Sequence, residues 1–405
     1  MNIKEIKGGI TAARGFLAAG IHCGLKKHKK DLSLIYSENI CTAAAVFTSN
    51  KVKGAPILVS KDHLKNNLAQ AIITNSGNAN TCNGDDGIKK ATEMTKYAAK
   101  ALGVSIENVL VASTGVIGVP LNLEPIKEFT PTLVSSLSKD GHTDALLGIM
   151  TTDTSPKEIA VKVDIDGTTI TIGAMCKGSG MIEPNMCTML SYITTDVSIT
   201  PELLQSALKS SVDVSYNRIS VDGDTSTNDS VFILANGKSG NKLISKKDDS
   251  YYTFLNALNY INVILAKKIA KDGEGATKLL ECKVSGCDTE ENALLLSKSV
   301  IKSSLVKTAM FGCDANWGRI LCALGYSKVD FDPNKVDVSF KSNFGKICVC
   351  KQGSSVNFDE DLALNILKQD EILIDVNMNN GNAEISTWGC DLSYEYVKIN
   401  GEYRS

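Results

Sequence analysis

One segment near the middle of the chain pairs a glycine-rich loop with a threonine that could serve as a nucleophile. It spans residues 177–190 and reads KGSGMIEPNMCTML. If the hydroxyl of Thr188 attacked the carbonyl of Cys187, the chain would be cut between these residues and Thr188 would gain a free α-amine. Because an α-amine has a pKa of about 8, it could accept the proton of the adjacent hydroxyl near neutral pH.

The same residues also fit a purely structural interpretation. Threonine favours strands, and apolar Met189 and Leu190 follow Thr188, so the segment could be a glycine loop that enters a buried strand. Because threonines are common in strands and single motifs often match by chance, the residues alone favour the strand. We find no Ser/His/Asp arrangement, Walker loop or dinucleotide-binding glycine motif. A cysteine nucleophile with a histidine base stays open, although no cysteine stands out.

Five loops of the chain share an unusual richness in glycine and in small hydroxyl or amide residues. They are residues 75–80, 113–118, 177–180, 222–229 and 271–275. Such loops let backbone amides approach a ligand closely. Any one of them could be an ordinary turn, but five in one chain favour a polar binding site.

Several of these segments, in the same order, resemble motifs of the ornithine acetyltransferase family, the glutamate N-acetyltransferases of arginine biosynthesis. The matching segments are 47–50, 75–80, 113–115, 150–154, 177–190, 223–229, 271–278 and 316–319. The resemblance runs along essentially the whole chain, and several motifs in matching order are far more specific than any one of them. It therefore reverses the preference for a structural Thr188.

The resemblance implies roles for particular residues. It implies a cut between Cys187 and Thr188, with Thr188 as the nucleophile at the start of a second chain. It implies Thr114 and Gly115 as an oxyanion hole, where donors aimed at a tetrahedral oxygen contribute a few kcal/mol each. The implied substrate contacts are Thr154, Lys177, Thr188, Glu274, Asn400 and Ser405.

Charge agrees with these implied contacts, because Lys177 can pair with a carboxylate and Glu274 with an amino group. Two positions depart from the family pattern. Cys187 replaces the usual alanine before the nucleophile, and the tail ends in Arg404-Ser405 where a final threonine is common. The contacts at the tail are therefore less secure than the nucleophile.

The implied activity is ping-pong transfer of acetyl from N2-acetyl-L-ornithine to L-glutamate, with no metal or prosthetic group. Whether acetyl-CoA serves as a second donor stays open. One alternative is a self-cleaving aminopeptidase or amidase of the same fold, which would hydrolyse the ester. Another is a noncatalytic small-molecule binding protein, which would stay uncleaved. The resemblance also implies an assembly of two α and two β chains.

Composition sets broad limits on the protein. The 405 residues carry a net charge of −2 and are 43% hydrophobic, which is typical of a soluble globular protein with no basic surface for nucleic acid. The basic cluster at residues 26–30 is interpreted as a solvated turn. Twelve dispersed cysteines and four scattered histidines favour neither disulfides nor a metal site. Without a signal-like or membrane-spanning run, a cytoplasmic protein is expected.

Strand and helix patterns alternate along the chain. Residues 159–165 and 169–175 are predicted to form a hairpin around Asp166-Gly167. The predicted helices cover 85–102, a segment that starts after Thr200 with Pro201 at its first position, 252–271 and 360–368. The pattern indicates a layered α/β fold like that of N-terminal-nucleophile proteins, a sandwich of sheets flanked by helices. We predict a catalytic domain over 1–280, cut into 1–187 and a chain starting at 188, and a smaller α+β domain over 281–405.

Overall fold

The computed structural model describes residues 3–183 and 189–402, which pack as two compact units. Unit 1 contains residues 3–178, 189–217 and 225–265, and unit 2 contains residues 179–183, 218–224 and 266–402. Two short segments, 179–183 and 218–224, therefore belong to unit 2 although the chain around them belongs to unit 1. The final crossing into unit 2 lies within helix α6 (Asp249–Lys271). The boundary predicted near residue 280 stays a prediction. Across the two described ranges, no helix has the length and apolar character needed to cross a membrane.

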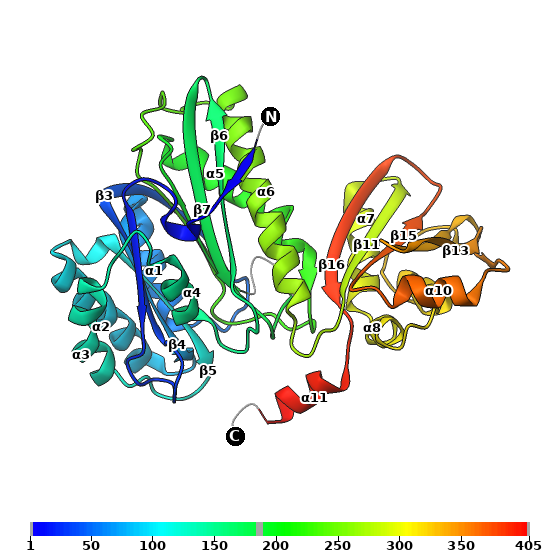
Figure 1. The fold of residues 1–405 in the computed structure, drawn as a ribbon, viewed down its shortest axis with the longest axis horizontal. Coiled ribbons are helices and arrows are strands. Elements are labelled where there is room, and N and C mark those ends of the chain that lie inside the picture. The colour runs from blue at the N-terminus through cyan, green and yellow to red at the C-terminus, as the bar shows by residue number, and fades with distance from the viewer. Residues whose placement is uncertain (1–2, 184–188, 403–405) are drawn as a thin grey trace. The chain divides into compact units, whose positions relative to one another are not determined.

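Nine strands of the described chain form one sheet in unit 1 (Figure 1). Their order is β1-β6-β7-β8-β10-β3-β4-β5, with β2 paired to β3. The strands are β1 (Lys4–Ile6), β2 (Phe16–Ile21), β3 (Leu32–Phe47), β4 (Leu68–Asn78), β5 (Val109–Val116), β6 (Lys157–Ile165), β7 (Thr168–Lys177), β8 (Leu190–Thr195) and β10 (Ser230–Ala235). The predicted hairpin is confirmed: β6 and β7 pair antiparallel, and Asp166 and Gly167 both have the positive φ of a type I′ turn.

Helices cover both faces of this sheet. They are α1 (Ala55–His63), α2 (Gly84–Leu102), α3 (Glu124–Ser135), α4 (His142–Ile149), α5 (Pro201–Asp213) and the first part of α6. α1, α2 and α3 lie side by side in Figure 1 and share a core with Ala71 and Ile73 of β4. Ile72 points to the opposite face, into a core with α4, as the two-residue period of a strand requires. Residues of β5, β8 and β10 meet in that second core, so strands on both sides of β3 contribute to it.

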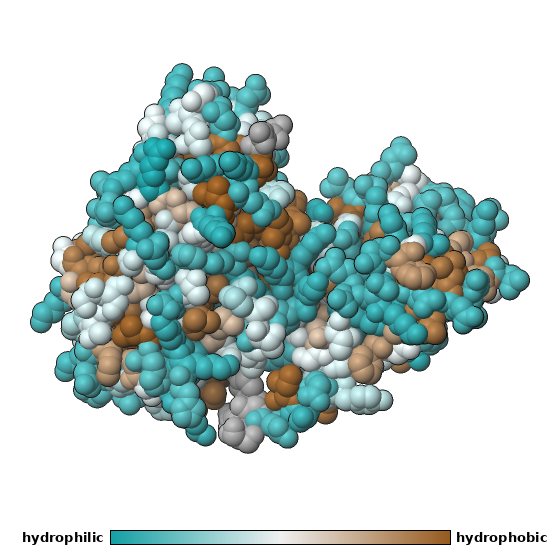
Figure 2. All heavy atoms as spheres, viewed as in Figure 1, coloured by the Kyte–Doolittle hydropathy of each residue, from teal (hydrophilic) through white to brown (hydrophobic). Residues whose placement is uncertain are grey.

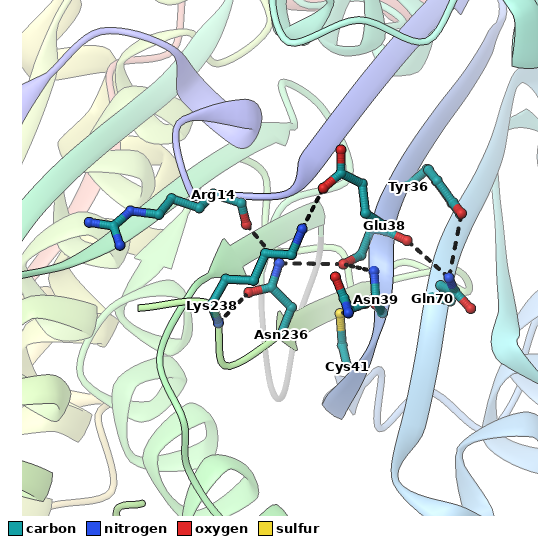
Figure 3. Close-up of polar contacts among 9 residues, drawn as sticks. Arg14, Tyr36, Glu38, Asn39, Cys41, Gln70, Asn236 and Lys238 are labelled. Atoms are coloured by element: carbon teal, nitrogen blue, oxygen red, sulfur yellow. Dashed lines mark hydrogen bonds and ion pairs between the residues drawn. The ribbon is translucent and has the colours of Figure 1, made fainter. Parts of the chain in front are cut away.

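Strand β3 changes its partner halfway along, and a group of polar contacts marks the change (Figure 3). It pairs first with β2 and then with β10, and its register with β4 shifts over residues 36–41, as in a β-bulge. The side chain of Asn236, which follows β10, donates to the carbonyl of Arg14, 2.7 Å away. Lys238 pairs with Glu38 in the bulge. These contacts join the ends of β2 and β10 to the bulge of β3.

Unit 2 is built on a seven-stranded sheet of order β14-β13-β12-β15-β11-β16-β9 within the described chain. The strands are β9 (Ile219–Ser220), β11 (Leu279–Cys287), β12 (Asp337–Ser342), β13 (Gly345–Lys351), β14 (Ser354–Ser355), β15 (Glu371–Asn377) and β16 (Ala383–Cys390). Its helices are α7 (Glu290–Lys302), α8 (Ser304–Phe311), α9 (Trp317–Gly325), α10 (Glu360–Leu367) and α11 (Tyr394–Gly401). Residues of α7, α8, α9 and α10 share one core with the sheet, so this unit is α+β.

The predicted mixed α/β class and the predicted helices are confirmed. Thr200 precedes α5 with Pro201 at its first position, and α6 begins three residues earlier than expected. Helix α11 was not predicted. None of its residues is fully buried, and Val397 is 71% exposed. Figure 2 shows hydrophobic residues on the visible face of this helix. The remaining 3₁₀ turns are η1 (Gly9–Thr11), η2 (Leu64–Asn66), η3 (Ile106–Asn108), η4 (Tyr216–Arg218) and η5 (Pro333–Lys335).

Candidate active site

The predicted nucleophile and its surroundings fall partly outside the described residues. Cys187, Thr188 and Ser405 lie outside the described residues. The chain after the predicted cut enters the sheet at Leu190, where β8 starts between β7 and β10. The N–H of Ser230 donates to the carbonyl of Met189 at 3.0 Å, which fixes the entry to β8. The predicted nucleophile thus lies two residues before a strand in the interior of the sheet order.

The predicted oxyanion residues Thr114 and Gly115 lie at the end of β5, beside β4. Thr114 is buried, and Gly115 pairs with Gly77 where the β4–β5 register becomes irregular. Gly115 has a φ of 133°, and a Cβ there would be 2.3 Å from the carbonyl carbon of Gly77. Both facts require glycine at this position. The result is a close approach of two backbones where the pairing of β4 and β5 becomes irregular.

Asn228 joins three of the five polar loops in unit 1. Its side-chain amide donates to the carbonyl of Ser113, 2.9 Å away, and to the carbonyl of Ala79. Its side-chain oxygen accepts a hydrogen bond from Thr81. Because Asn228 is only 7% exposed, these contacts form inside the protein. They bring the loops 75–80, 113–118 and 222–229 together, as a shared site requires.

A buried ion pair holds Lys177 and the loop that contains Thr154. Asp153 accepts hydrogen bonds from Lys157 Nζ and from the N–H of Gly178, both at 2.7 Å. Burial acts to raise the pKa of Asp153, but the charges of Lys157 and Lys177 bring that pKa below its ordinary value. Asp153 therefore stays ionised and ties the exposed Thr154 loop to the end of β7. Thr154 and Lys177 are thus held by one carboxylate.

Lys26 is half-buried near this region, which the sequence did not indicate. It belongs to the cluster interpreted as a solvated turn, yet it is half-buried, and its Nζ donates to the carbonyls of Met150 and Lys30 at 2.6 and 3.0 Å. The pKa of Lys26 is lowered to about 8, mainly by burial and also by the charges of Lys29 and Lys177. The solvated-turn interpretation is wrong for Lys26, because its neighbours come from β4 and from the loop before β6.

In unit 2, Glu274 and Asn400 are brought together. Asn400 Nδ2 donates to Glu274 Oε2 at 2.8 Å, so α11 places its last turn over the loop 271–275. Glu274 is 8% exposed, and its N–H donates to the carbonyl of Ser179 at 3.0 Å. A Cβ on Gly180 would be 2.3 Å from the Glu274 carboxyl group, so glycine leaves room for this side chain. The loops 177–180 and 271–275 therefore meet within this unit.

Comparisons with known proteins give the family. Residues 17–405 match the model of the ArgJ family. The chain belongs to the ArgJ family. An ArgJ relative, arginine biosynthesis bifunctional protein ArgJ 1 of Clostridium acetobutylicum, is 54% identical over 98% of this chain and 97% of its own length. Another, arginine biosynthesis bifunctional protein ArgJ of Caldanaerobacter subterraneus subsp. tengcongensis, is 51% identical over 99% of both chains.

A solved ArgJ structure also matches. The crystal structure of arginine biosynthesis bifunctional protein ArgJ from Bacillus halodurans is 43% identical, with a TM-score of 0.51. The match covers 53% of this chain and 100% of that chain. The described fold is therefore shared with an ArgJ protein over about half of the present chain.

Proposed function

We propose that this protein transfers an acetyl group from N2-acetyl-L-ornithine to L-glutamate, which yields ornithine and N-acetylglutamate. The observation that carries this proposal is the 54% identity, over 98% of the chain, to a protein named as a bifunctional enzyme of arginine biosynthesis. Because the relatives are called bifunctional, the proposal includes acetyl-CoA as a second acetyl donor. We include cytoplasmic function and an assembly of two α and two β chains.

The proposal includes self-cleavage before Thr188. The Thr188 hydroxyl attacks the carbonyl carbon of Cys187, the C–N bond breaks, and the hydroxyl proton passes to the new α-amine. Water then hydrolyses the resulting ester and leaves a carboxylate on Cys187. Such a cut leaves pieces of 187 and 218 residues of 405. It is supported by the solved Bacillus halodurans chain, which is matched over its full length yet spans 53% of this chain.

Acetyl transfer then uses the freed threonine. Thr188 Oγ attacks the acetyl carbonyl of the donor while the α-amine accepts the hydroxyl proton and passes it to the leaving ornithine amine. Donors at Thr114 and Gly115 stabilise the tetrahedral oxygen, and both residues lie at the end of β5, where its register with β4 becomes irregular. The glutamate amine next attacks the acetyl ester, which regenerates the threonine hydroxyl. These steps need no metal or prosthetic group.

Charged residues account for the amino-acid substrates. Lys177, beside the ionised Asp153, binds a substrate carboxylate, and Glu274, paired with Asn400, binds an amino group. Thr154 adds a hydroxyl from the loop that Asp153 holds, and Ser405 contributes a contact from the tail. Thr188→Ala should leave the chain uncut and without transferase activity.

Two measurements test the proposal. Intact mass should show two fragments, 1–187 and 188–405, whose masses add up to that of the uncut chain plus one water. Incubation with acetylornithine should release ornithine in proportion to added glutamate. Acetate release that does not depend on glutamate would support the amidase alternative instead. An uncut wild-type chain without activity would support the binding-protein alternative.

A further inference from the structure

One carboxylate holds the peptide that leads to the predicted cut. Asp222 Oδ2 accepts a hydrogen bond from the N–H of Met181 at 2.7 Å, and Oδ1 accepts one from the N–H of Ile182 at 2.8 Å. All three residues belong to unit 2, although about 40 residues separate Asp222 from its partners along the chain. Charge-assisted bonds of this kind are about twice as strong as neutral ones. Asp222 thus binds two successive amides of this segment.

Backbone bonds extend the contact on both sides of Asp222. The N–H of Val221 donates to the carbonyl of Ile182 at 2.6 Å, and the N–H of Glu183 donates to the carbonyl of Asp224 at 2.9 Å. The segments 181–183 and 221–224 are therefore joined by four hydrogen bonds, two of which end on the Asp222 side chain. The backbone bonds involve neither the N–H of Met181 nor that of Ile182, and the Asp222 carboxylate accepts hydrogen bonds from both.

The conformation of Met181 explains why this support is needed. Met181 has a φ of 57°, in the left-handed region that is unfavourable for a residue with a Cβ. Its side chain is 42% exposed, so burial of the side chain contributes little to keeping this conformation. The bond from its N–H to Asp222 is the contact that compensates. A strained backbone held by a specific contact is typical of functional segments.

Asp222 itself is held in place. The carboxylate of Asp222 acts on the hydroxyl of Tyr396 on α11 and raises the pKa of that hydroxyl. Burial raises the pKa of Tyr396, and the carboxylates of Asp222, Glu274 and Asp224 raise it further, so the hydroxyl remains a donor. The N–H of Asp224 approaches Asp222 Oδ1 at 3.3 Å. With these contacts the carboxylate has little freedom to turn away from Met181 and Ile182.

The position of this segment in the sequence points to its role. Glu183 is four residues before Cys187, and on the other side of the predicted cut Met189 is bound to Ser230. Glu183 is therefore hydrogen-bonded within unit 2, and Met189 within unit 1. Attack of a hydroxyl on its neighbouring carbonyl depends on orientation, and a misplacement of about 1 Å can cost about 100-fold in rate.

We infer that Asp222 is a positioning residue for self-cleavage, which fixes the peptide on the carbonyl side of the Cys187–Thr188 bond by binding the amides of Met181 and Ile182. This inference rests on the proposed self-cleavage at that bond. Asp222 does not touch the reacting atoms in this role. It acts by limiting the conformations of the chain that carries the Cys187 carbonyl.

The experiment follows maturation of freshly synthesised full-length chain by intact mass over time. Asp222→Asn should slow the appearance of the 188–405 fragment by about 10-fold or more, because the side chain loses its charge and one acceptor. Asp224→Asn is the matched control. It removes a carboxylate from the same loop but keeps the backbone carbonyl that binds Glu183, so it should mature at the wild-type rate.

A rescue variant separates positioning from a general folding defect. Met181→Gly makes the left-handed conformation favourable without help, so the double variant Met181→Gly/Asp222→Asn should recover much of the maturation rate. Maturation of Asp222→Asn at the wild-type rate would overturn the inference, and so would a slow Asp222→Asn variant that Met181→Gly fails to rescue. Cleavage of Thr188→Ala at the same bond would instead overturn the proposed self-cleavage.

Discussion

Two carboxylates, the buried Asp153 and the half-buried Asp222, bind neighbouring parts of the same loop, one in each unit, and their surroundings differ. Asp153 in unit 1 binds the N–H of Gly178 and is paired with Lys157, so its pKa is lowered. Asp222 in unit 2 binds Met181 and Ile182, and burial together with the charge of Asp224 raises its pKa. The ionised form is favoured for Asp153 by its lysine neighbours, whereas burial and the charge of Asp224 disfavour the ionised form of Asp222. The start of the loop is therefore held by an ion pair, and the part nearer the predicted cut by a carboxylate whose charge is disfavoured.

The largest expected effect comes from removing the buried ion pair of Asp153 and Lys157 in unit 1. Lys157→Met should lower the free energy of unfolding by about 3–5 kcal/mol, because it leaves Asp153 as an unpaired ion whose side chain is fully buried. Urea unfolding measures the loss. The double variant Asp153→Asn/Lys157→Met should recover a large part of it, since no unpaired charge remains. A single variant as stable as wild type would contradict this role of the ion pair.

Gly115 in unit 1 faces a backbone that cannot move easily, whereas Gly180 in unit 2 faces a side chain that can rotate. Gly115→Ala should reduce kcat by roughly 100- to 1000-fold, because the new methyl group meets the backbone of Gly77 and displaces an oxyanion donor. Gly180→Ala meets the Glu274 carboxyl group, which can rotate away. It should mainly raise KM. Steady-state kinetics on cleaved protein distinguishes the two, and equal losses in kcat would contradict the contrast.

The pH dependence of stability should have opposite signs for the two acids. The folded-state pKa of Asp153 is lowered, so its contribution to stability is present above its unfolded pKa and is lost as pH falls through the folded value. The folded-state pKa of Asp222 is raised, so its contribution is present below its unfolded pKa and is lost as pH rises through the folded value. Asp222→Asn should therefore gain stability relative to wild type as pH rises from about 4 to neutral. Unfolding temperatures over this range measure the difference, and a constant difference would contradict the raised pKa.

The smallest expected effect concerns the exposed end of α11. Asn400→Ala removes the bond to Glu274 and should raise KM several-fold, equivalent to about 1 kcal/mol, with little change in kcat. Lys398→Ala on the same helix is the control, because the exposed pair of Lys398 and Glu395 contributes little. Equal effects of the two variants would mean that Asn400 has no special contact with substrate.

Local chemistry allowed much of the framework to be predicted. The hairpin of β6 and β7 follows from alternation and Asp166-Gly167, and the start of α5 follows from Thr200 and Pro201. Helix α11 could not be found in this way, because it buries no residue and so carries no apolar period. Its start depends on Ser393, whose side chain accepts the N–H of Glu395 and donates to the carbonyl of Gly275.

Long-range contacts set the limit for the site. The glycine loops and the resemblance predicted the site residues, and the roles of Gly115, Glu274 and Asn400 stay predictions. The same residues did not reveal that Asn228 joins three loops or that Asp222 faces Met181. Each of these contacts spans tens of residues, and residue type alone does not choose the partner. Lys26 was misjudged for the same reason, since its burial comes from distant segments.

The place of β8 and β10 in the sheet has a consequence for the cut protein. Both strands follow the predicted cut, and β7 and β3, which flank them, precede it. The two pieces would share two seams of backbone hydrogen bonds and could separate only if the sheet opened along both. Unfolding would then also separate the two pieces, so the melting temperature of mature protein should depend more steeply on protein concentration than that of the uncut chain. Maturation would thus add the association of two pieces to the folding equilibrium of this sheet.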